Sequence, residues 1–174
     1  MGAQAELVKG PAMVLGPEEG ASYWQGGTHR GYMTVKVGPH NHPANLFSMG
    51  IQVIPPGCHI RAHGHARNDE ILFVYQGTGH CVVDGATHPL ETGSTMMLGR
   101  FVEHSIHNDG TDEMRLVWFF TPPGLEQVVE AGGRRRTAGE AAPDNIERPA
   151  NLSQVLDRAG WATPEQLQAA RRKD

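Results

Sequence analysis

The chain of 174 residues has few of the features that mark secreted, membrane or nucleic-acid-binding proteins. It contains only two cysteines, Cys58 and Cys81, which argues against a disulfide framework and for a reducing, intracellular compartment. It has no uninterrupted apolar run of membrane-spanning length, and its first residues do not resemble an export signal. The net charge of -4 gives no general attraction to polyanions. We therefore expect a cytoplasmic protein with no nucleic-acid partner and no membrane partner.

Short strand patterns dominate the middle of the chain. The apolar residues of 47–53 alternate with small or polar residues, which is the two-residue period of a half-buried strand. Further strand-like runs follow over 71–75, 80–83, 94–98, 104–107 and 115–120, and turn residues such as Asp84-Gly85 separate them. Several short strands at this spacing predict an all-β sandwich or barrel. The chain length fits a single core.

The pattern divides the chain into four segments. Residues 1–45 form an N-terminal arm with a possible added strand, and residues 46–124 form the barrel. Residues 125–150 begin with a possible short helix and continue, over 131–149, as a Gly- and Arg-rich surface loop or lid. Residues 151–174 are expected to contain two short helices. The capping pattern Thr163-Pro164-Glu165-Gln166 predicts the start of the second one.

Four residues in this region predict a metal site. On a strand, residues two apart point to the same face, so His63 and His65 can offer two imidazole nitrogens to one ion. Glu70 opens the next strand, and closure of the barrel would bring His104 beside the first pair. Three imidazoles and one carboxylate suit one divalent ion of Fe, Mn, Ni, Co, Cu or Zn, and the ligands alone do not choose among them.

Two other interpretations of these residues stay open. The first takes them as ordinary polar strand residues. The second takes them as the ligands of a structural zinc site, although structural zinc usually uses thiolates and the two cysteines lack the spacing. The remaining histidines at 29, 40, 42, 80 and 88 have no partner spacing and are interpreted as surface or rim residues. His107 is expected on the strand face opposite His104.

Candidate substrate contacts follow from the same strand parity. His59 and Arg61 share parity with His63 and are expected near the mouth of the site. Apolar residues that alternate as a barrel interior should are expected to pack the core and in part to contact a small substrate. These are Phe47, Met49, Ile51 and Trp118.

At these residues the sequence resembles the cupin superfamily. The first motif of that family reads Gly, five residues, His-x-His, three or four residues, Glu, six residues, Gly. Gly57, His63, His65, Glu70 and Gly77 match every position.

The second family motif is matched in part. His104 and Asn108 fit its end, and Gly93 can serve as its first glycine. The sequence has Gly99 where the family has Pro and Phe101 where the family has Gly. The shape of this turn is therefore expected to differ from that of the family.

The resemblance covers about residues 46–123 and carries implications for fold and activity. It implies an antiparallel jelly-roll barrel with the metal inside its mouth, in a protein that is usually a homodimer. The set of three histidines and one glutamate resembles that of single-cupin quercetinase-like dioxygenases.

Three functions remain in view. The first is a metal-dependent dioxygenase that cleaves a carbon-carbon bond in a small enolic, phenolic or 1,3-dicarbonyl substrate, with Glu70 as ligand or catalytic base and dioxygen as co-substrate. The second is a redox-neutral isomerase, decarboxylase or lyase acting on a small oxygenated acid. The third is a non-catalytic cupin that binds a small molecule.

Overall fold

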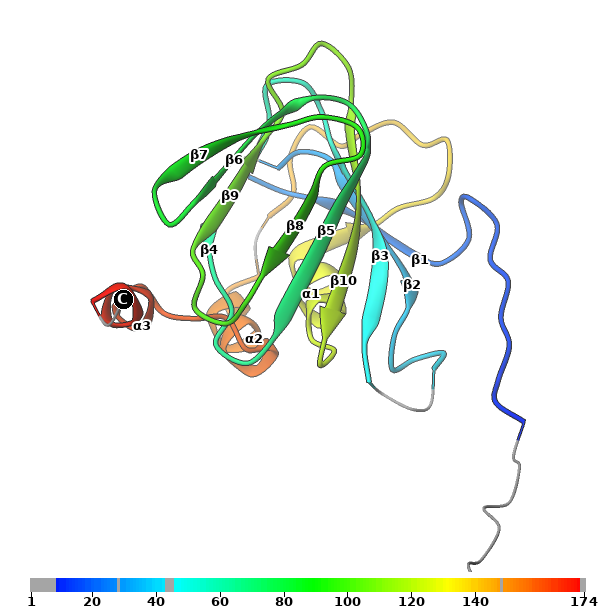
Figure 1. Cartoon of the computed structure of the whole chain (residues 1–174). Coiled ribbons are helices and arrows are strands. Elements are labelled where there is room, and N and C mark those ends of the chain that lie inside the picture. Colours follow the sequence, from blue (N-terminus) through cyan, green and yellow to red (C-terminus); the bar gives the residue numbers. More distant parts are fainter. Residues whose placement is uncertain (1–8, 28, 43–45, 148, 173–174) are drawn as a thin grey trace, which may run out of the picture.

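Two antiparallel β-sheets face each other in the computed structural model, which describes residues 9–27, 29–42, 46–147 and 149–172 (Figure 1). The larger sheet has seven strands in the order β11-β1-β2-β3-β10-β5-β8. Their bounds are β1 Ala21–Gln25, β2 Tyr32–Val37, β3 Ser48–Ile54, β5 Asp69–Gln76, β8 Thr95–Leu98, β10 Met114–Thr121 and β11 Gly133–Arg135.

The smaller sheet has four strands in the order β4-β9-β6-β7. Their bounds are β4 His59–His63, β6 Gly79–Val83, β7 Ala86–Leu90 and β9 His104–His107. From β3 to β10 the chain crosses between the two sheets at each step except at β6–β7, and Asp84 and Gly85 close this hairpin at positive φ, as their sequence predicts. The all-β jelly-roll fold with short helices is thereby confirmed.

The hydrophobic core lies between the two sheets. Trp118, Phe120 and Leu72 of the larger sheet pack with Ile106 and Cys81 of the smaller sheet, and all five are almost fully buried. Each buried side chain of this size contributes about 1.5–3 kcal/mol relative to an exposed one. This packing fixes the distance between the sheets and so positions the residues that both sheets contribute to the site.

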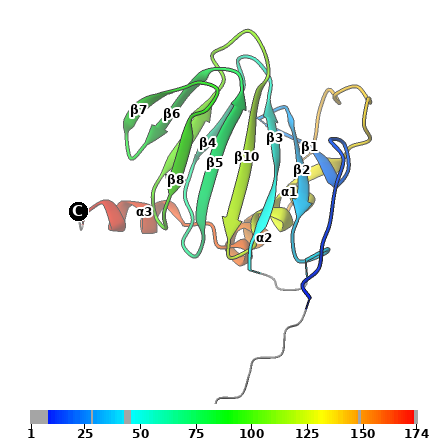
Figure 2. The same cartoon turned by 45° about the vertical axis from the view of Figure 1, so that its right-hand side comes forward.

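Three helices lie at one end of the sandwich (Figure 2). Their bounds are α1 Leu125–Gly132, α2 Leu152–Ala159 and α3 Pro164–Arg171. The capping box between Thr163 and Gln166 forms as predicted, and Gly160, in the left-handed region, ends α2. None of the helices in the described ranges is long and apolar enough to cross a membrane.

Strands outside the predicted barrel extend the larger sheet. The N-terminal arm supplies two added strands, β1 and β2, and β11 pairs with β1 in antiparallel register. The prediction of a loop over 131–149 is therefore wrong at Gly133–Arg135. The backbone groups along the free edge of β1 pair with those of β11, which makes this short basic segment a strand.

The faces of β3 are opposite to those predicted. Gly50 and Gln52 point into the sandwich, and a Cβ at Gly50 would lie 2.5 Å from the Trp118 ring. Met49 and Ile51 therefore lie on the outer face, where Phe47 stacks on Phe119. Three further apolar side chains of this sheet are exposed: Ile71, Phe73 and Met97. The predicted homodimer stays a prediction.

Candidate metal centre

The four predicted ligands come from both sheets and the loop between them. His63 ends β4 and pairs with His104 at the start of β9, whereas Glu70 lies in β5 of the facing sheet. His65 follows Gly64 beyond the end of β4 and forms an isolated bridge with Trp161. The prediction that His63 and His65 lie on one regular strand is therefore wrong. The loop after β4 still directs both rings to one point.

A β-bulge explains the direction of His63. The register of β4 against β9 shifts between Ile60 and His63, so both residues face the interior although their numbers differ in parity. Position 64, the next residue, requires glycine, because a Cβ there would lie 2.7 Å from the Leu167 side chain and 2.9 Å from the Val102 carbonyl oxygen.

The four side chains converge on a common point. One nitrogen from each of His63, His65 and His104 and one oxygen from Glu70 all lie within 4.8 Å of one another. Glu70 Oε2 is 3.1 Å from His65 Nε2 and 3.2 Å from His104 Nε2. His65, Glu70 and His104 are buried and His63 is half-buried. Such convergence of nitrogen and carboxylate donors is the geometry of a metal-binding site.

Backbone carbonyl groups orient two of the imidazoles. His63 Nδ1 donates to the Arg61 carbonyl at 2.8 Å, and His104 Nδ1 donates to the Val102 carbonyl at 3.0 Å. Because a carbonyl oxygen only accepts, Nδ1 carries the proton in each ring and Nε2 keeps its lone pair. His104 Nε2 is buried, and it lies 3.2 Å from Glu70 Oε2. The tautomers that a metal ion requires are therefore already selected.

The charges of the cluster also suit a cation. Burial alone would raise the pKa of Glu70, but the facing imidazoles of His104 and His65 outweigh it and hold that pKa below its usual range. Burial, with His104 and His65 nearby, lowers the pKa of His63 to about 3. Burial opposes protonation of His104, yet the Glu70 carboxylate raises its pKa overall. A bound ion would take the place of that proton.

A cavity of about 440 Å³ opens beside the cluster. His63, Glu70 and His104 form part of its wall, and helices α1 and α2 contribute five of its apolar side chains. The larger apolar lining residues are Met33, Ile60, Leu72, Ile106, Leu125, Val128, Val129, Leu152, Leu156, Trp161 and Leu167. This size and lining are typical of sites for small, largely apolar molecules.

The predicted substrate contacts divide into two groups. His59 and Arg61 do line the cavity, so their role stays a prediction with a suitable location. Phe47, Met49 and Ile51 do not, because the orientation of β3 turns them to the outer face. Trp118 is fully buried over Gly50 in the core and is not part of the cavity wall.

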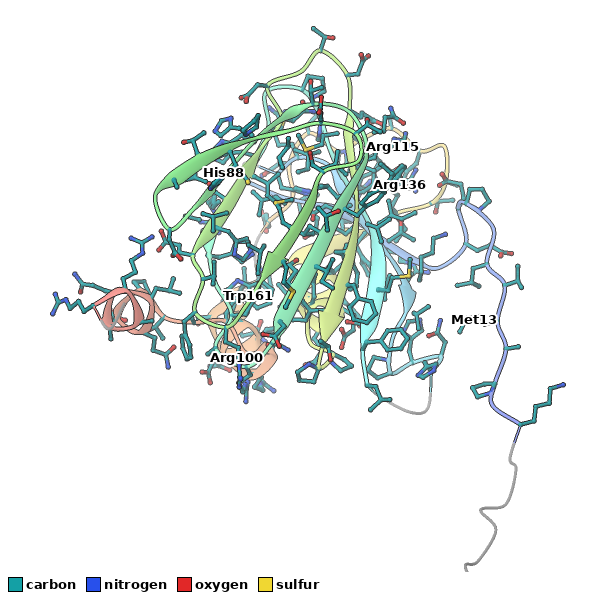
Figure 3. All side chains as sticks on the ribbon, viewed as in Figure 1. Met13, His88, Arg100, Arg115, Arg136 and Trp161 are labelled. Carbon is teal, nitrogen blue, oxygen red and sulfur yellow. The ribbon has the colours of Figure 1, made fainter. Side chains whose placement is uncertain are left out.

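Trp161 was not predicted as a site residue, although it contacts the cluster directly. Its ring stacks on His63 at 5.6 Å and meets His65 edge-on at 4.5 Å. Figure 3 labels Trp161 at the end of the sandwich where α2 lies. Two backbone hydrogen bonds, Ala66 N to Gly160 O and Ala162 N to Gly64 O, tie this segment to the loop that carries His65. No pattern in the sequence connects a segment after α2 with the first metal motif.

Comparison with known proteins agrees with this fold. Residues 50–120 match the family described as "Cupin domain". The chain is 33% identical to Protein SchB of Streptomyces halstedii over 98 residues, which is 56% of this chain and 68% of SchB. It is 31% identical to "Polyketide synthase CurC" of Streptomyces cyaneus over 74 residues, which is 42% of this chain and about half, 48%, of CurC.

A solved structure supports the fold alone. The "predicted oxalate decarboxylase" of Thermotoga maritima superposes with a TM-score of 0.57 at 19% identity, covering 63% of this chain and 98% of the other. The two-sheet sandwich and its cluster of three histidines and one glutamate define a barrel protein with a candidate metal centre. The chain belongs to the cupin superfamily.

Proposed function

We propose that this protein is a metal-dependent dioxygenase that cleaves a carbon-carbon bond in an apolar substrate with an enolic, phenolic or 1,3-dicarbonyl group. The observation that carries the proposal is the convergence of His63, His65, Glu70 and His104 at the wall of a mainly apolar cavity. The four side chains would hold one divalent ion, which supplies Lewis-acid and, if it is redox-active, dioxygen chemistry.

The chain's own groups have defined parts in this reaction. The apolar wall would hold the carbon skeleton and exclude water, while Trp161 limits how the rings of His63 and His65 move. Glu70 is ionised and would accept the proton of the substrate hydroxyl. In the overall change one carbon-carbon bond breaks, each of its carbons gains one oxygen atom, and dioxygen is reduced.

The charge of the cavity favours this substrate class over small acids. Of the described residues that line it, only Arg61 is positively charged, and its side chain is exposed. A small dianion would be poorly neutralised in such a site. The similarity to a relative named as a polyketide synthase supports an apolar, oxygenated substrate of the polyketide type.

A redox-neutral reaction on the same substrate class is the second candidate. Glu70 could remove a proton next to a carbonyl group without any oxidant, and the similarity to CurC is compatible with this chemistry. The two candidates share the site and differ in whether dioxygen is consumed.

Oxygen consumption tests the proposal. Protein loaded in turn with Fe, Mn, Ni, Co, Cu and Zn is mixed with 3-hydroxyflavone or dibenzoylmethane, and substrate loss and dioxygen uptake are followed together. The dioxygenase predicts one dioxygen consumed per substrate lost, with Glu70→Gln inactive and His107→Ala active. Equal turnover under nitrogen would identify the redox-neutral enzyme. Metal-dependent binding without turnover would identify a binding protein.

A further inference from the structure

A second polar group lines the cavity and is not part of the metal cluster. His29, in the segment between β1 and β2, lines the cavity together with Gln52 on the inner face of β3. His29 is 8% exposed and Gln52 is 6% exposed. Sequence reasoning placed His29 at the surface, because nothing near it in the chain suggests a partner. The structure corrects that placement.

One ring nitrogen of His29 is held and the other is not. His29 Nε2 lies 3.1 Å from the side-chain amide of Gln52, within hydrogen-bonding distance. His29 Nδ1 is buried and has no hydrogen-bond partner among the described residues. Burial also lowers the pKa of His29 to about 4, so the ring is neutral near pH 7.

A purely structural role explains this arrangement poorly. Buried polar atoms in folded proteins nearly always have a partner, and an unpaired one is costly. Here the unpaired atom belongs to a side chain that borders a cavity large enough for a small molecule. A neutral imidazole nitrogen in this position matches an uncharged oxygen function, because no charged side chain among the described residues forms a hydrogen bond or ion pair with His29.

We propose that His29, held by Gln52, is a substrate-binding residue that recognises a carbonyl or hydroxyl group on a part of the substrate that is not bound at the metal cluster. This inference rests on the proposed function, since it assumes a substrate whose enolic or phenolic group is bound at the cluster. It adds the requirement that the substrate carry a second, uncharged oxygen function beyond its metal-binding group.

Three substitutions separate the two nitrogens of His29. His29→Phe keeps a ring and removes both nitrogens. His29→Gln keeps a polar group near the position of Nε2, facing Gln52, and removes the one at Nδ1. His29→Asn does the reverse and keeps a polar atom near Nδ1. His42→Phe is the matched control, because His42 Nδ1 is also unpartnered but its ring packs on Phe47 and does not line the cavity.

The probes differ by one hydroxyl group. Binding of 3-hydroxyflavone, 3,7-dihydroxyflavone and 3,4′-dihydroxyflavone to the Zn²⁺-loaded full chain is measured by calorimetry, since zinc is not redox-active and prevents oxidative turnover. We expect at least one dihydroxy probe to bind about three- to tenfold more tightly than 3-hydroxyflavone, the range of one hydrogen bond. His29→Phe and His29→Gln lose this ratio, whereas His29→Asn and His42→Phe retain it.

The ratio between probes, rather than the affinity itself, is the readout, since a general loss of structure would weaken all three probes together. If neither dihydroxy probe gains affinity, or the gain survives in both His29→Phe and His29→Gln, the role of His29 is overturned while the metal site stands. If 3-hydroxyflavone binds equally well to metal-free protein, the proposed function and this inference both fail. Should His29→Phe not fold, the comparison of His29→Gln with His29→Asn decides.

Discussion

Strands β4 and β9 each carry histidines of two different groups, and the contrast between them is instructive. His63 and His104 belong to the cluster that faces the interior, whereas His59 and His107, four and three residues away, stack on each other with ring centroids 5.1 Å apart. His80 of β6 continues this second group, stacking on His107 at 4.4 Å. The same residue type, on the same strands, thus forms two unlike assemblies.

The difference lies in where the ring nitrogens point. In the stack the rings are nearly parallel, at 13° and 3°, so their in-plane lone pairs do not meet. In the inner cluster the rings are inclined at 48° to 81° to one another, and a carboxylate lies among them. Within the described residues, only the inner cluster brings three or more donors together as a metal site requires. Number of histidines is therefore a weaker indicator of metal binding than convergence.

Removing one histidine from each group gives the largest expected difference. His104→Ala deletes a donor at the centre of the inner cluster and should weaken metal binding by at least about 100-fold, so that the purified variant carries little metal. His107→Ala, three residues away, should bind metal like the unmodified chain. Elemental analysis and competition with a chelating dye measure both. A similar loss of metal affinity in both variants would contradict the claim that only the inner cluster binds the metal.

Metal removal should lower the thermal stability through the inner cluster alone. An ion at 100 times its dissociation constant stabilises the fold by about 2.7 kcal/mol, which for a chain of this size is about 5–10 °C in Tm. Calorimetry before and after chelation should show this shift in the unmodified chain and in His107→Ala. His104→Ala should show almost none. A chelator effect of equal size in His104→Ala would place the stabilising ion elsewhere.

The smallest expected effect concerns the stack. Burial, followed by the neighbours His80 and His59, lowers the pKa of His107, while Asp109 acts in the opposite direction. Because the unfolded chain takes up this proton at a higher pH, the stack loses stability as the pH falls below the usual histidine range. His80→Asn or His59→Asn should raise the pKa of His107, as followed by NMR of the imidazole signals.

The exposed His88 on β7 supplies the control for that titration. His88→Asn leaves the stack intact and should not move the pKa of His107. If all three variants titrate like the unmodified chain, the stacked neighbours do not influence His107.

Much of the fold and the ligand set could be predicted because both depend on local patterns. The two-residue alternation and the Asp84-Gly85 turn indicated strands, and the spacing of His63, His65 and Glu70 indicated shared donors. The β-bulge before His63 was not visible in the sequence. The bulge changes the backbone path that carries these side chains, but the side chains still converge on one point.

What failed depends on contacts between distant segments. Alternation alone favoured the apolar face of β3 and so turned Met49 and Ile51 inward, whereas the Trp118 ring of the neighbouring strand leaves room on the inner face for Gly50. His29 and Trp161 reach the cavity only because β1, β2 and α2 pack around it. Such neighbours are set by topology, and no local pattern encodes them.

The most direct test of the account is the location of the ion itself. Crystals of the chain purified with its native metal, measured at the absorption edge of that metal, should give one anomalous peak per chain. We predict that the peak lies about 2.0–2.3 Å from His63, His65 and His104 nitrogens and a Glu70 oxygen. A peak at His59, His80 or His107, or no peak after growth with excess metal, would contradict the account.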